Sequence, residues 1–210
     1  MNISSNAIER ICKIFGYLED LTRRDISFVS SRELAHAVGA TDYTVRKDIS
    51  LLGLTGYTRK GYAVSSLKQQ LGNKLQLAKK RKACIVGLGR LGTALFDYEK
   101  FQADGFDIVA GFDSSINKIE RIRTHIDVFM VDELQKVVTE RKIELGIITV
   151  PAEAAQATAD DLVAAGVKGI LNFAPVKLVV PRHIMYLDMD FTSALRYIAA
   201  RLAIGAESCR

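Results

Sequence analysis

The stretch CIVGLGRLGTALFDY, from Cys84 to Tyr98, decides the fold of the larger part of the chain. A short apolar segment leads into closely spaced glycines, and a segment of helical character follows them. The first glycine makes the tight turn, the second lets the backbone approach a pyrophosphate, and the third lets the helix pack on the strand. Backbone N–H groups at the start of such a helix bind phosphate, so this stretch predicts a dinucleotide site. Its candidate residues are Gly87, Leu88, Gly89, Arg90, Leu91 and Gly92.

A second apolar segment ends in Gly-Phe-Asp, and its Asp113 lies about twenty residues beyond the glycine turn. An acid at this position accepts hydrogen bonds from the hydroxyls of the adenine ribose. No base occurs in the five residues DSSIN that begin at Asp113, so the sequence predicts NAD(H) rather than NADP(H). The alternative is that Asp113 is only a turn residue at the end of a strand.

From Ala83 onward, apolar strand candidates alternate with helical stretches, which predicts a parallel, doubly wound α/β sheet. The candidates are Ala83–Val86, Asp107–Phe112, Val128–Val131, Leu145–Val150, Gly169–Phe173 and Met185–Met189. Ligands of such sheets bind where the strands end. The strand ends therefore add Val150, Pro151, Asn172, Phe173, Ala174 and Pro175 as cofactor candidates. Loop capping without a ligand is the alternative for these residues.

The first 82 residues differ from the rest in charge. They carry 15 Lys and Arg against 7 Asp and Glu, whereas residues 83–210 carry 14 against 17. This asymmetry favours a polyanionic partner for the first part of the chain. A soluble basic domain without such a partner is the alternative.

The stretch FVSSRELAHAVGATDYTVRKDISLLG, which begins at Phe28, predicts a helix-turn-helix. Ser30 and Glu33 fit a capping box, and Gly39 fits the end of that first helix. The second helix has one apolar face and one face with cations, a hydroxyl and an aromatic ring, as a DNA-recognition helix requires. Glycines then bracket a basic segment that predicts the tip of a wing. The candidate DNA-binding residues are Ser31, Tyr43, Thr44, Arg46, Lys47, Ser50, Arg59 and Lys60.

Composition excludes several classes of protein. There is no apolar run of about 18 residues, so the sequence predicts no transmembrane helix, and the N-terminal stretch lacks the core of a signal peptide. Three widely spaced cysteines form no CxxC pair, which argues against a disulfide framework and against a metal site. These features predict a cytoplasmic protein.

The last predicted helix, FTSALRYIAARLAIGAE, is nearly apolar on all sides. Such a helix must be buried, and at the end of a chain a partner subunit is the readiest cover. The cofactor site is complete, yet no histidine lies in the strand-end loops and no Tyr-x-x-x-Lys pair occurs. Hydride transfer to a carbonyl usually needs an acid–base group, so the sequence predicts a protein that senses the dinucleotide, not an enzyme.

Nearly the whole chain resembles the Rex family of redox-sensing transcriptional repressors. The stretches that carry the resemblance are SSRELAHAVGATDYTVRKDIS, VGLGRLGTAL, GFD, VPAEAAQ and GVKGILNFAP. The resemblance implies a winged helix-turn-helix domain, a Rossmann-like domain and a C-terminal helix swapped between the subunits of a homodimer. It also implies that NADH releases the repressor from double-stranded operator DNA, while NAD⁺ permits DNA binding.

The resemblance also implies roles for single residues. Arg46 and Lys47 match the recognition-helix pair, and Tyr98 matches a signalling tyrosine near the nicotinamide. Asp190 and Phe191 match the start of the swapped helix, where the phenylalanine lines the partner's nicotinamide pocket. An arginine of the family's first helix is replaced here by Gly16, and the basic wing tip departs from the usual family pattern.

These observations predict three parts, namely a DNA-binding domain over residues 1–78, a cofactor domain over 79–190 and a dimerisation helix over 191–210. Two other readings stay open. One is a small NAD-dependent oxidoreductase with an accessory nucleic-acid module. The other is a coenzyme A-binding module, because the stretch from Val150 to Leu171 also resembles that domain of acyl-CoA ligases.

Overall fold

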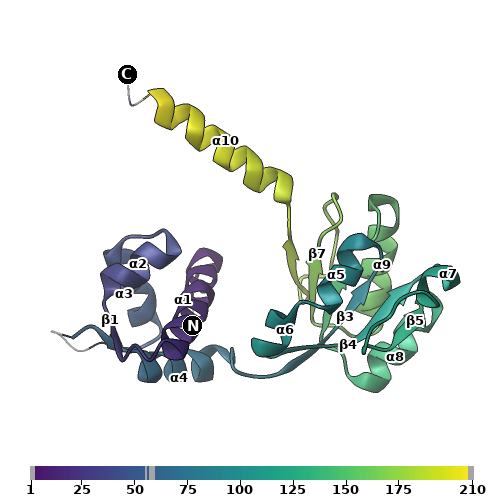
Figure 1. Cartoon of the computed structure of the whole chain (residues 1–210), viewed down its shortest axis with the longest axis horizontal. Helices are drawn as coiled ribbons and strands as arrows, with labels where there is room; N and C mark the ends of the chain where they lie inside the picture. Colours follow the sequence, from purple (N-terminus) through teal and green to yellow (C-terminus); the bar gives the residue numbers. More distant parts are fainter. Residues whose placement is uncertain (1–2, 55, 57–59, 208–210) are drawn as a thin grey trace. The chain divides into compact units, whose positions relative to one another are not determined.

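The computed structural model describes residues 3–54, 56 and 60–207. The chain divides into two compact units, unit 1 over residues 1–79 and unit 2 over residues 80–210 (Figure 1). Each unit has its own hydrophobic core.

Unit 1 is a small helical unit with a two-stranded sheet. Its elements are α1 (Ser5–Arg23), β1 (Phe28–Val29), α2 (Ser31–Val38), α3 (Asp42–Leu51), β2 (Tyr62–Ala63) and α4 (Val64–Leu75). Apolar side chains from all four helices fill one core, which includes Ile11, Leu34, Ile49 and Leu71. The three-helix arrangement α1–α3 therefore has α4 as a packed fourth member.

The local signals for α2 and α3 are confirmed. The Ser30 hydroxyl accepts a hydrogen bond from the Glu33 backbone N–H, and the Glu33 carboxylate accepts one from the Ser30 N–H, which completes the capping box. Gly39 ends α2 with φ of 65°, a left-handed conformation that favours glycine. Thr41 then caps α3 by accepting a hydrogen bond from the Thr44 N–H.

The predicted wing is only partly within the described residues. β2 pairs antiparallel with β1, which precedes α2, so the partner of this strand comes from before the helix-turn-helix. Arg59 and the rest of 57–59 lie outside the described residues. A Cβ atom on Gly61 would lie 2.4 Å from the Val29 carbonyl oxygen, so glycine lets the two strands approach each other.

Unit 2 contains a six-stranded parallel sheet in the order β5-β4-β3-β6-β7-β8. The strands are β3 (Arg81–Val86), β4 (Phe106–Asp113), β5 (Val128–Met130), β6 (Leu145–Ile148), β7 (Gly169–Asn172) and β8 (Met185–Asp188). The chain works outward from β3 to one edge and then returns to β6 on the other side. This is the strand order of a Rossmann-type sheet, and it confirms the predicted α/β fold.

The carboxyl ends of the strands are in register. Phe112, Val86, Ile148, Asn172 and Asp188 are successive cross-strand neighbours. All six predicted strands are present, with ends that differ by up to two residues. Residues that follow these positions therefore gather at one edge of the sheet, as the predicted cofactor site requires.

Helices cover the two faces of the sheet unequally (Figure 1). On one face, α8 (Leu134–Arg141) and α9 (Ala152–Ala164) pack against β3, β4 and β6. On the other face, α5 (Arg90–Phe96) and α6 (Glu99–Ala103) cover the β3 and β4 side. Residues 173–184, between β7 and β8, contain no helix. The α5–α6 face of β7 and β8 is consequently left open, and Leu187 on it is 61% exposed.

Unit 2 also contains α7 (Ile116–Ile119), the short 3₁₀ helix η1 (Val131–Glu133) and α10 (Phe191–Glu207). The large apolar side chains of α10 are exposed, with Leu195 at 66% and Leu202 at 70%. Within the described part of the chain, no helix is both long and apolar enough to span a membrane. The same residues hold no cluster of His, Cys, Asp and Glu suited to a metal ion.

Candidate functional site

The glycine turn between β3 and α5 has the geometry that its sequence predicts. Gly87 has φ of 99°, and a Cβ there would lie 2.7 Å from the Val150 backbone nitrogen. A Cβ on Gly92 would lie 2.1 Å from the Gly87 carbonyl oxygen, so the helix packs directly on the turn. Gly89 has no heavy atom of the described residues within 4 Å of its Cβ position. This open side leaves room for a phosphate beside the backbone.

Neighbouring strands fix the turn in place. The Gly87 N–H donates to the Phe112 carbonyl of β4 over 2.8 Å. From the end of β6, the Thr149 hydroxyl donates to the Gly87 carbonyl over 2.6 Å. Thr149 was not among the predicted site residues, because its partner lies 62 positions away in the sequence. The turn is therefore preorganised by both flanking strands.

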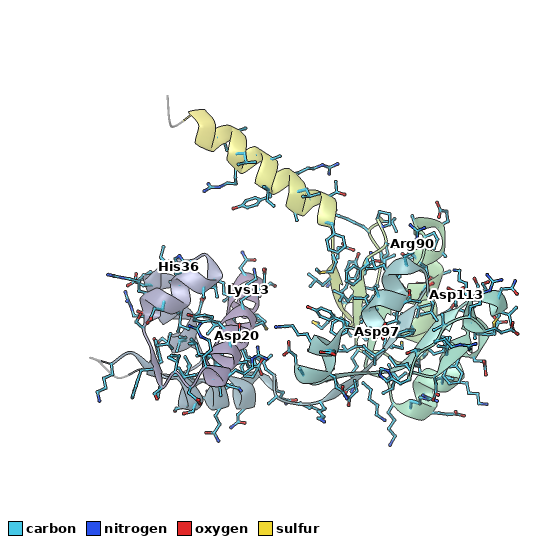
Figure 2. The ribbon with its side chains drawn as sticks, viewed as in Figure 1. Lys13, Asp20, His36, Arg90, Asp97 and Asp113 are labelled. Carbon is cyan, nitrogen blue, oxygen red and sulfur yellow. The ribbon has the colours of Figure 1, made fainter. Side chains whose placement is uncertain are left out.

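Asp113 ends β4 beside the glycine turn, and Figure 2 labels it together with Arg90 at the start of α5. Its carboxylate is only 4% exposed and accepts hydrogen bonds from the backbone N–H groups of Leu88 (2.8 Å) and Ser115 (2.9 Å). Burial acts to raise the pKa of this carboxyl group, but hydrogen bonds from Ser115, Lys118 and Leu88 outweigh it and lower the pKa. Asp113 is thus an ionised acceptor at the edge where the strands end.

Lys118 is the residue that the sequence analysis missed at this place. It follows directly after the stretch DSSIN, and its ammonium group lies 3.1 and 3.3 Å from the two Asp113 oxygens. The turn through α7 brings it back to the strand end. A base therefore faces Asp113, and the preference for NAD(H) over NADP(H) stays a prediction.

The ends of β6 and β7 carry the other cofactor candidates. Val150 lies against the glycine turn, and Pro151 begins α9 as its N-cap residue. Asn172 is fully buried, and its amide nitrogen donates to the carbonyl oxygens of Ala174 and Val176 and to Asp188. The Asn172 side chain caps its own loop, which was the alternative considered for it. It thereby holds Phe173, Ala174 and Pro175 at the sheet edge.

Two further residues support this loop and were not predicted. The Tyr186 hydroxyl donates to the same Asp188 oxygen that binds Asn172, and it accepts a hydrogen bond from the Leu178 N–H over 3.1 Å. Asn172 lies in β7, and Tyr186 and Asp188 lie in β8, so their side chains form a polar network that joins the ends of both strands. The spacing of the sequence gave no signal for this network.

A pocket of about 500 Å³ opens beside the loop, and its lining includes Phe173, Pro175, Asp188 and Phe191. The rings of Phe173 and Phe191 have centroids 5.9 Å apart within the single chain. Asp190 accepts hydrogen bonds from the backbone N–H and the hydroxyl of Ser193 in the first turn of α10, and these bonds lower its pKa. That a partner's Phe191 reaches this pocket stays a prediction.

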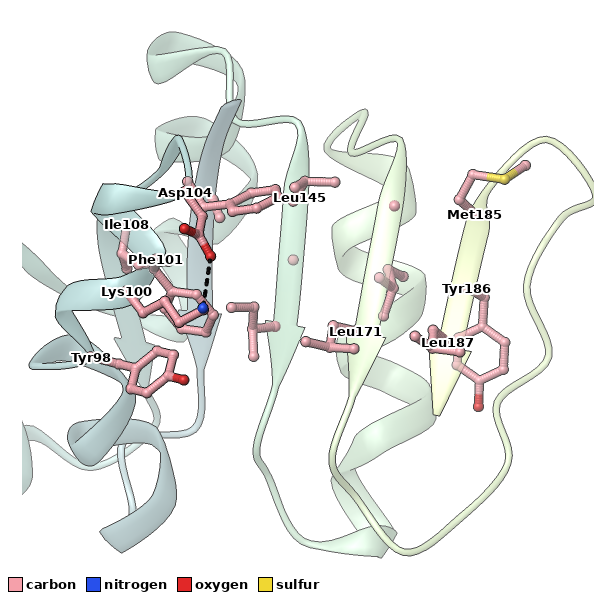
Figure 3. Close-up of a pocket in the computed structure, with 16 residues that line it drawn as sticks. Tyr98, Lys100, Phe101, Asp104, Ile108, Leu145, Leu171, Met185, Tyr186 and Leu187 are labelled. Atoms are coloured by element: carbon pink, nitrogen blue, oxygen red, sulfur yellow. Dashed lines mark ion pairs between the residues drawn. The ribbon is translucent and has the colours of Figure 1, made fainter. Parts of the chain in front are cut away.

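Tyr98 lies on the open face of the sheet. It precedes α6, is about half exposed and packs edge-on against Phe101 at 5.0 Å. Figure 3 shows it on one wall of a groove of about 490 Å³ that extends across β6, β7 and β8. Apolar side chains such as Ile108, Leu171 and Leu187 line most of this groove.

The exposed polar face predicted for α3 is present, and its role in DNA recognition stays a prediction. Tyr43, Arg46, Lys47 and Ser50 are exposed on it, whereas Val45 and Ile49 are buried on the opposite face. The Arg46 guanidinium is held by the Asp42 carboxylate at 2.6 Å and by the Ser31 hydroxyl at 3.2 Å. Ser31 therefore belongs to the same surface, and Arg46 has partners that a phosphate or base edge would have to replace.

Two other features border this surface. Thr44 shares a hydrogen bond of 2.8 Å with the capping residue Thr41, so its hydroxyl also serves the helix start. Lys60, before β2, has its ammonium 5.5 Å from the ring centroid of Phe28 in β1. The basic side chain is thus tied to the strand pair beside the helix-turn-helix.

Arg10 and Asp48 form a partly buried ion pair on the inner side of α3. The Arg10 guanidinium of α1 binds both oxygens of Asp48 in α3 at 2.7 and 3.1 Å, and Asp48 is only 3% exposed. Bidentate geometry fixes orientation as well as distance. The sequence analysis did not identify this pair, because the two residues are 38 positions apart.

Two protein-family models match the chain. The one described as "CoA binding domain" matches residues 78–176, and the one described as "Putative DNA-binding protein N-terminus" matches residues 2–50. The two matches divide the chain much as its two compact units do.

Curated relatives match over nearly their whole length and carry the name redox-sensing transcriptional repressor Rex. The protein from Carboxydothermus hydrogenoformans is 41% identical, over 93% of this chain and 94% of the relative. Those from Thermus thermophilus and Clostridium beijerinckii are 42% and 37% identical, over 93% and 92% of this chain and 92% of each relative.

Solved structures give the same result. RSP, described as a Rex-family repressor, is 32% identical. Its complex with β-NADH matches with a TM-score of 0.86 over 98% of this chain and 97% of RSP. Its complex with β-NAD⁺ and operator DNA matches with a TM-score of 0.87 over 98% of this chain and 95% of RSP. With relatives of this identity over more than nine tenths of its length, the chain belongs to the Rex family of redox-sensing transcriptional repressors.

Proposed function

We propose that this chain is a transcriptional repressor that binds double-stranded operator DNA as a homodimer and is released when NADH binds unit 2. One observation carries the proposal. The chain joins an exposed basic helix face to a glycine turn that is open at Gly89, and over 98% of its length it matches RSP in a complex with NADH and in another complex with NAD⁺ and operator DNA.

The strand ends of unit 2 fit a dinucleotide. The open side of Gly89 would receive the pyrophosphate, and Asp113 would accept hydrogen bonds from the adenine ribose. The other candidates are Leu88, Arg90 and Leu91 in the turn, with Val150, Pro151 and residues 172–175 at the neighbouring strand ends. The nicotinamide ring of NAD⁺ carries one positive charge, which the ring of NADH lacks.

In unit 1, Arg46 and Lys47 would enter the major groove from α3. Arg46 would exchange its contacts with Asp42 and Ser31 for a base edge or a phosphate. Tyr43, Thr44, Ser50 and Lys60 border the same face, and Arg59 belongs to the proposed surface by its sequence. The surplus of positive charge in the first 82 residues favours association with DNA.

A second copy of the chain would cover two exposed apolar surfaces of unit 2. One is α10, with Leu195 and Leu202 exposed, and the other is the groove on the open face of the sheet. Soluble monomers rarely leave apolar surface of this extent exposed, so both surfaces favour an interface. Two recognition helices of a dimer would then lie one duplex turn apart, or a multiple of it.

The switch follows from differential binding. The pocket at Phe173 and Phe191 places two aromatic rings beside charged side chains that include Asp188 and Asp190. We expect its aromatic wall to bind the neutral nicotinamide of NADH better than the cation of NAD⁺, because a cation that stacks on apolar rings loses hydration. NADH then favours the dimer arrangement that fits it, and Tyr98 and Asp190 are the residues that we expect to take part in this change. Operator DNA must weaken NADH binding by the same factor by which NADH weakens DNA binding.

Two alternatives differ in their chemistry. A small NAD-dependent oxidoreductase would turn over NADH, whereas the relatives carry the name of repressors and a regulator has no turnover. A CoA-binding module has the match over residues 78–176 in its favour, but Asp113 favours a dinucleotide. Action on DNA also favours a cytoplasmic location for the proposed function.

The test is a DNA-binding titration with genomic promoter fragments and the full chain, in the presence of NADH, NAD⁺ or CoA. We expect NADH to weaken promoter binding at least about tenfold, a coupling typical of allosteric proteins. NAD⁺ should preserve binding, and CoA should have no effect. Unchanged affinity with saturating NADH would refute the sensor function.

Phe191→Ala is the matched variant for this test. It removes one ring from the pocket beside Phe173 and leaves the DNA-binding face of α3 intact. We expect it to bind promoter DNA normally and to need a higher NADH concentration for release. Steady consumption of NADH with candidate carbonyl compounds would instead support the enzyme.

A further inference from the structure

An acidic residue lies on the polar face of α3, beside the arginine that we expect to enter the major groove. Asp42 is the first residue of α3, and its carboxylate accepts a hydrogen bond from the Arg46 guanidinium over 2.6 Å. The same Arg46 nitrogen, Nη1, donates to the Ser31 hydroxyl of α2 over 3.2 Å. The hydrogen bond from Arg46 lowers the pKa of Asp42, so this surface carries a negative charge at neutral pH.

The stability of α3 does not depend strongly on this pair. An acid in the first turn favours a helix start, and a pair of opposite charges four residues apart adds a little stability. Thr41 already caps α3, however, and the Arg46 and Asp42 side chains are 51% and 45% exposed. Ion pairs exposed to this extent contribute little to folding. The pair therefore matters mainly for the partner that approaches this surface.

Binding of DNA would separate the two charges. Arg46 has to leave Asp42 before it can donate to the O6 and N7 acceptors of a guanine in the major groove. Asp42 then remains charged and without its cation, near phosphates that repel it. The exchange is unfavourable on every duplex, unless a base compensates the carboxylate.

The bases differ in whether they can compensate a carboxylate. In the major groove, cytosine offers the N4 amino group and adenine the N6 amino group, whereas guanine and thymine offer acceptors and a methyl group. An ionised carboxylate has no hydrogen to donate to those acceptors. Asp42 can thus discriminate by the penalty it adds on a wrong sequence as well as by the contact it makes on the right one.

We propose that Asp42 is a specificity-determining residue, which accepts a hydrogen bond from the exocyclic amino group of an operator cytosine or adenine and weakens binding to duplexes that lack this group. The inference rests on the proposed function, because it requires that α3 lies in the major groove. Asp42 and Arg46 are neighbours on one helix face, so the amino group belongs to a base pair within about two steps of the one that Arg46 reads.

The experiment is fluorescence anisotropy of the full chain with a promoter duplex that it binds, a scrambled duplex, and a panel of variants of the promoter duplex. In this panel each base pair of one half-site is replaced in turn. For the native chain, replacing the pair that carries the amino group should weaken binding about fivefold or more. For Asp42→Ala the same replacement should cost less than about twofold, with the costs at other positions unchanged. A structural role of Asp42 would not produce a change confined to one base pair.

The scrambled duplex measures the penalty. Without Asp42, Arg46 can neutralise a phosphate, so Asp42→Ala should bind the scrambled duplex at least about threefold more tightly. The dependence of log affinity on log salt concentration should become steeper by about one. Asp42→Asn removes the same charge and should show both effects, whereas Asp42→Glu retains the carboxylate and should show neither.

Asp20→Ala is the matched control. Asp20 forms an exposed ion pair with Arg23 within α1, so this substitution also removes one acid from an exposed pair on a single helix. It changes the net charge of the chain by the same amount as Asp42→Ala does. We expect Asp20→Ala to leave the base-pair profile unchanged and to affect the promoter and scrambled duplexes equally.

The outcomes separate the two proposals. If Asp42→Ala keeps the native base-pair profile and the native affinity for the scrambled duplex, the role of Asp42 is wrong and the proposed function stands. The same conclusion follows if Asp42→Ala strengthens binding to all duplexes equally, as a change in net charge alone would. If the native chain binds no promoter duplex, the proposed function fails and this inference fails with it.

Discussion

The helices α1 and α10, near the two ends of the chain, differ in where their apolar side chains go. α1 buries Ile11, Ile14 and Leu18 completely within unit 1. α10 has comparable apolar residues, yet Leu195 and Leu202 are mostly exposed. The apolar side chains of α1 are buried within its own unit, whereas Leu195 and Leu202 of α10 are not covered by the described residues.

Two buried carboxylates show the same contrast. Asp48 in unit 1 is held by the bidentate guanidinium of Arg10, a contact between two helices of one core. Asp113 in unit 2 is held partly by Lys118, whose side chain is half exposed. The partner of Asp48 therefore belongs to the core of unit 1, whereas unit 2 holds Asp113 partly through an exposed side chain and has an uncovered apolar face.

The strongest test of this contrast is the double substitution Leu195→Asp and Leu202→Asp. A leucine that becomes buried in an interface contributes about 1.5–3 kcal/mol to the free energy of association. We therefore expect the double substitution to weaken self-association by at least a factor of about a hundred. Sedimentation velocity over a range of concentrations measures this change. Because both side chains are exposed within the single chain, its thermal unfolding as a monomer should persist.

The result that would contradict the contrast is a double variant that still forms a stable dimer. In that case the exposed face of α10 is not the interface. The open groove on the sheet would then be the remaining apolar surface to test, with Leu187→Asp as the next variant.

The second test concerns the closed core of unit 1. Arg10→Met keeps most of the side-chain stem but leaves Asp48 charged, buried and without its cation. Removing one partner of a buried pair costs about 3–5 kcal/mol, and the partial exposure of Arg10 favours the lower value. Urea unfolding measures the change. Lys13→Met is the control, because the Lys13–Glu9 pair on the same helix is exposed and contributes at most about 0.5 kcal/mol.

Equal destabilisation by both variants would show that α1 as a whole, and not its pair with Asp48, is sensitive to substitution. Hydrogen exchange can measure the unfolding free energy of unit 2 in Arg10→Met. A decrease there equal to the decrease in unit 1 would show that the core of unit 1 is not independent of unit 2.

The third test is made on the surface of unit 1. If Arg46 reads a base, Arg46→Ala should weaken operator binding by about 1–3 kcal/mol, while stability changes little. Lys47→Ala should lower affinity evenly across sequences and reduce the salt dependence. Fluorescence anisotropy with operator and scrambled duplexes measures both effects. The same Lys13 variant should leave DNA affinity intact. An unchanged affinity of Arg46→Ala would remove Arg46 as a base-reading residue, and an unchanged affinity of the double substitution at Arg46 and Lys47 would remove α3 as the recognition helix.

The sequence predicted those features whose information is local. The capping box at Ser30, the left-handed Gly39 and the three glycine roles all depend on residues within a few positions of each other. The six strands follow from apolar runs between helical stretches. Each of these patterns has one favoured backbone solution, so no tertiary information was required.

The features that the sequence did not predict depend on contacts between distant residues or on a helix that the chain lacks at one place. The Arg10–Asp48 and Thr149–Gly87 contacts join residues 38 and 62 positions apart. Lys118 is close to Asp113 in sequence but lies one residue beyond the stretch DSSIN, on which the cofactor prediction rests. The open face of β7 and β8 results from a loop in place of a helix over residues 173–184, and loop length alone does not predict which face is left uncovered.

The smallest expected effect is an acid dependence that belongs to unit 2. Because the pKa of Asp113 is lowered in the folded chain, its ionised form contributes stability at a pH above the unfolded value of about 3.9. That contribution decreases as the pH falls through the folded pKa. Asp113→Asn removes the charge and turns an amide N–H toward the N–H groups that now donate to the carboxylate. At pH 7 we therefore expect the free energy of unfolding to decrease by on the order of 1 kcal/mol.

The difference between the native chain and Asp113→Asn should then shrink as the pH falls from 7 to 3, because protonation removes from native Asp113 what the substitution has already removed. Chemical unfolding at several pH values, with hydrogen exchange to follow unit 2, measures this convergence. Unit 1 provides the internal control, since its core contains neither Asp113 nor its partners. A difference that stays constant or widens toward low pH would mean that the hydrogen bonds from Leu88, Ser115 and Lys118 do not stabilise the charged form. Convergence would instead show that these hydrogen bonds stabilise the ionised carboxylate of Asp113 where β4 ends.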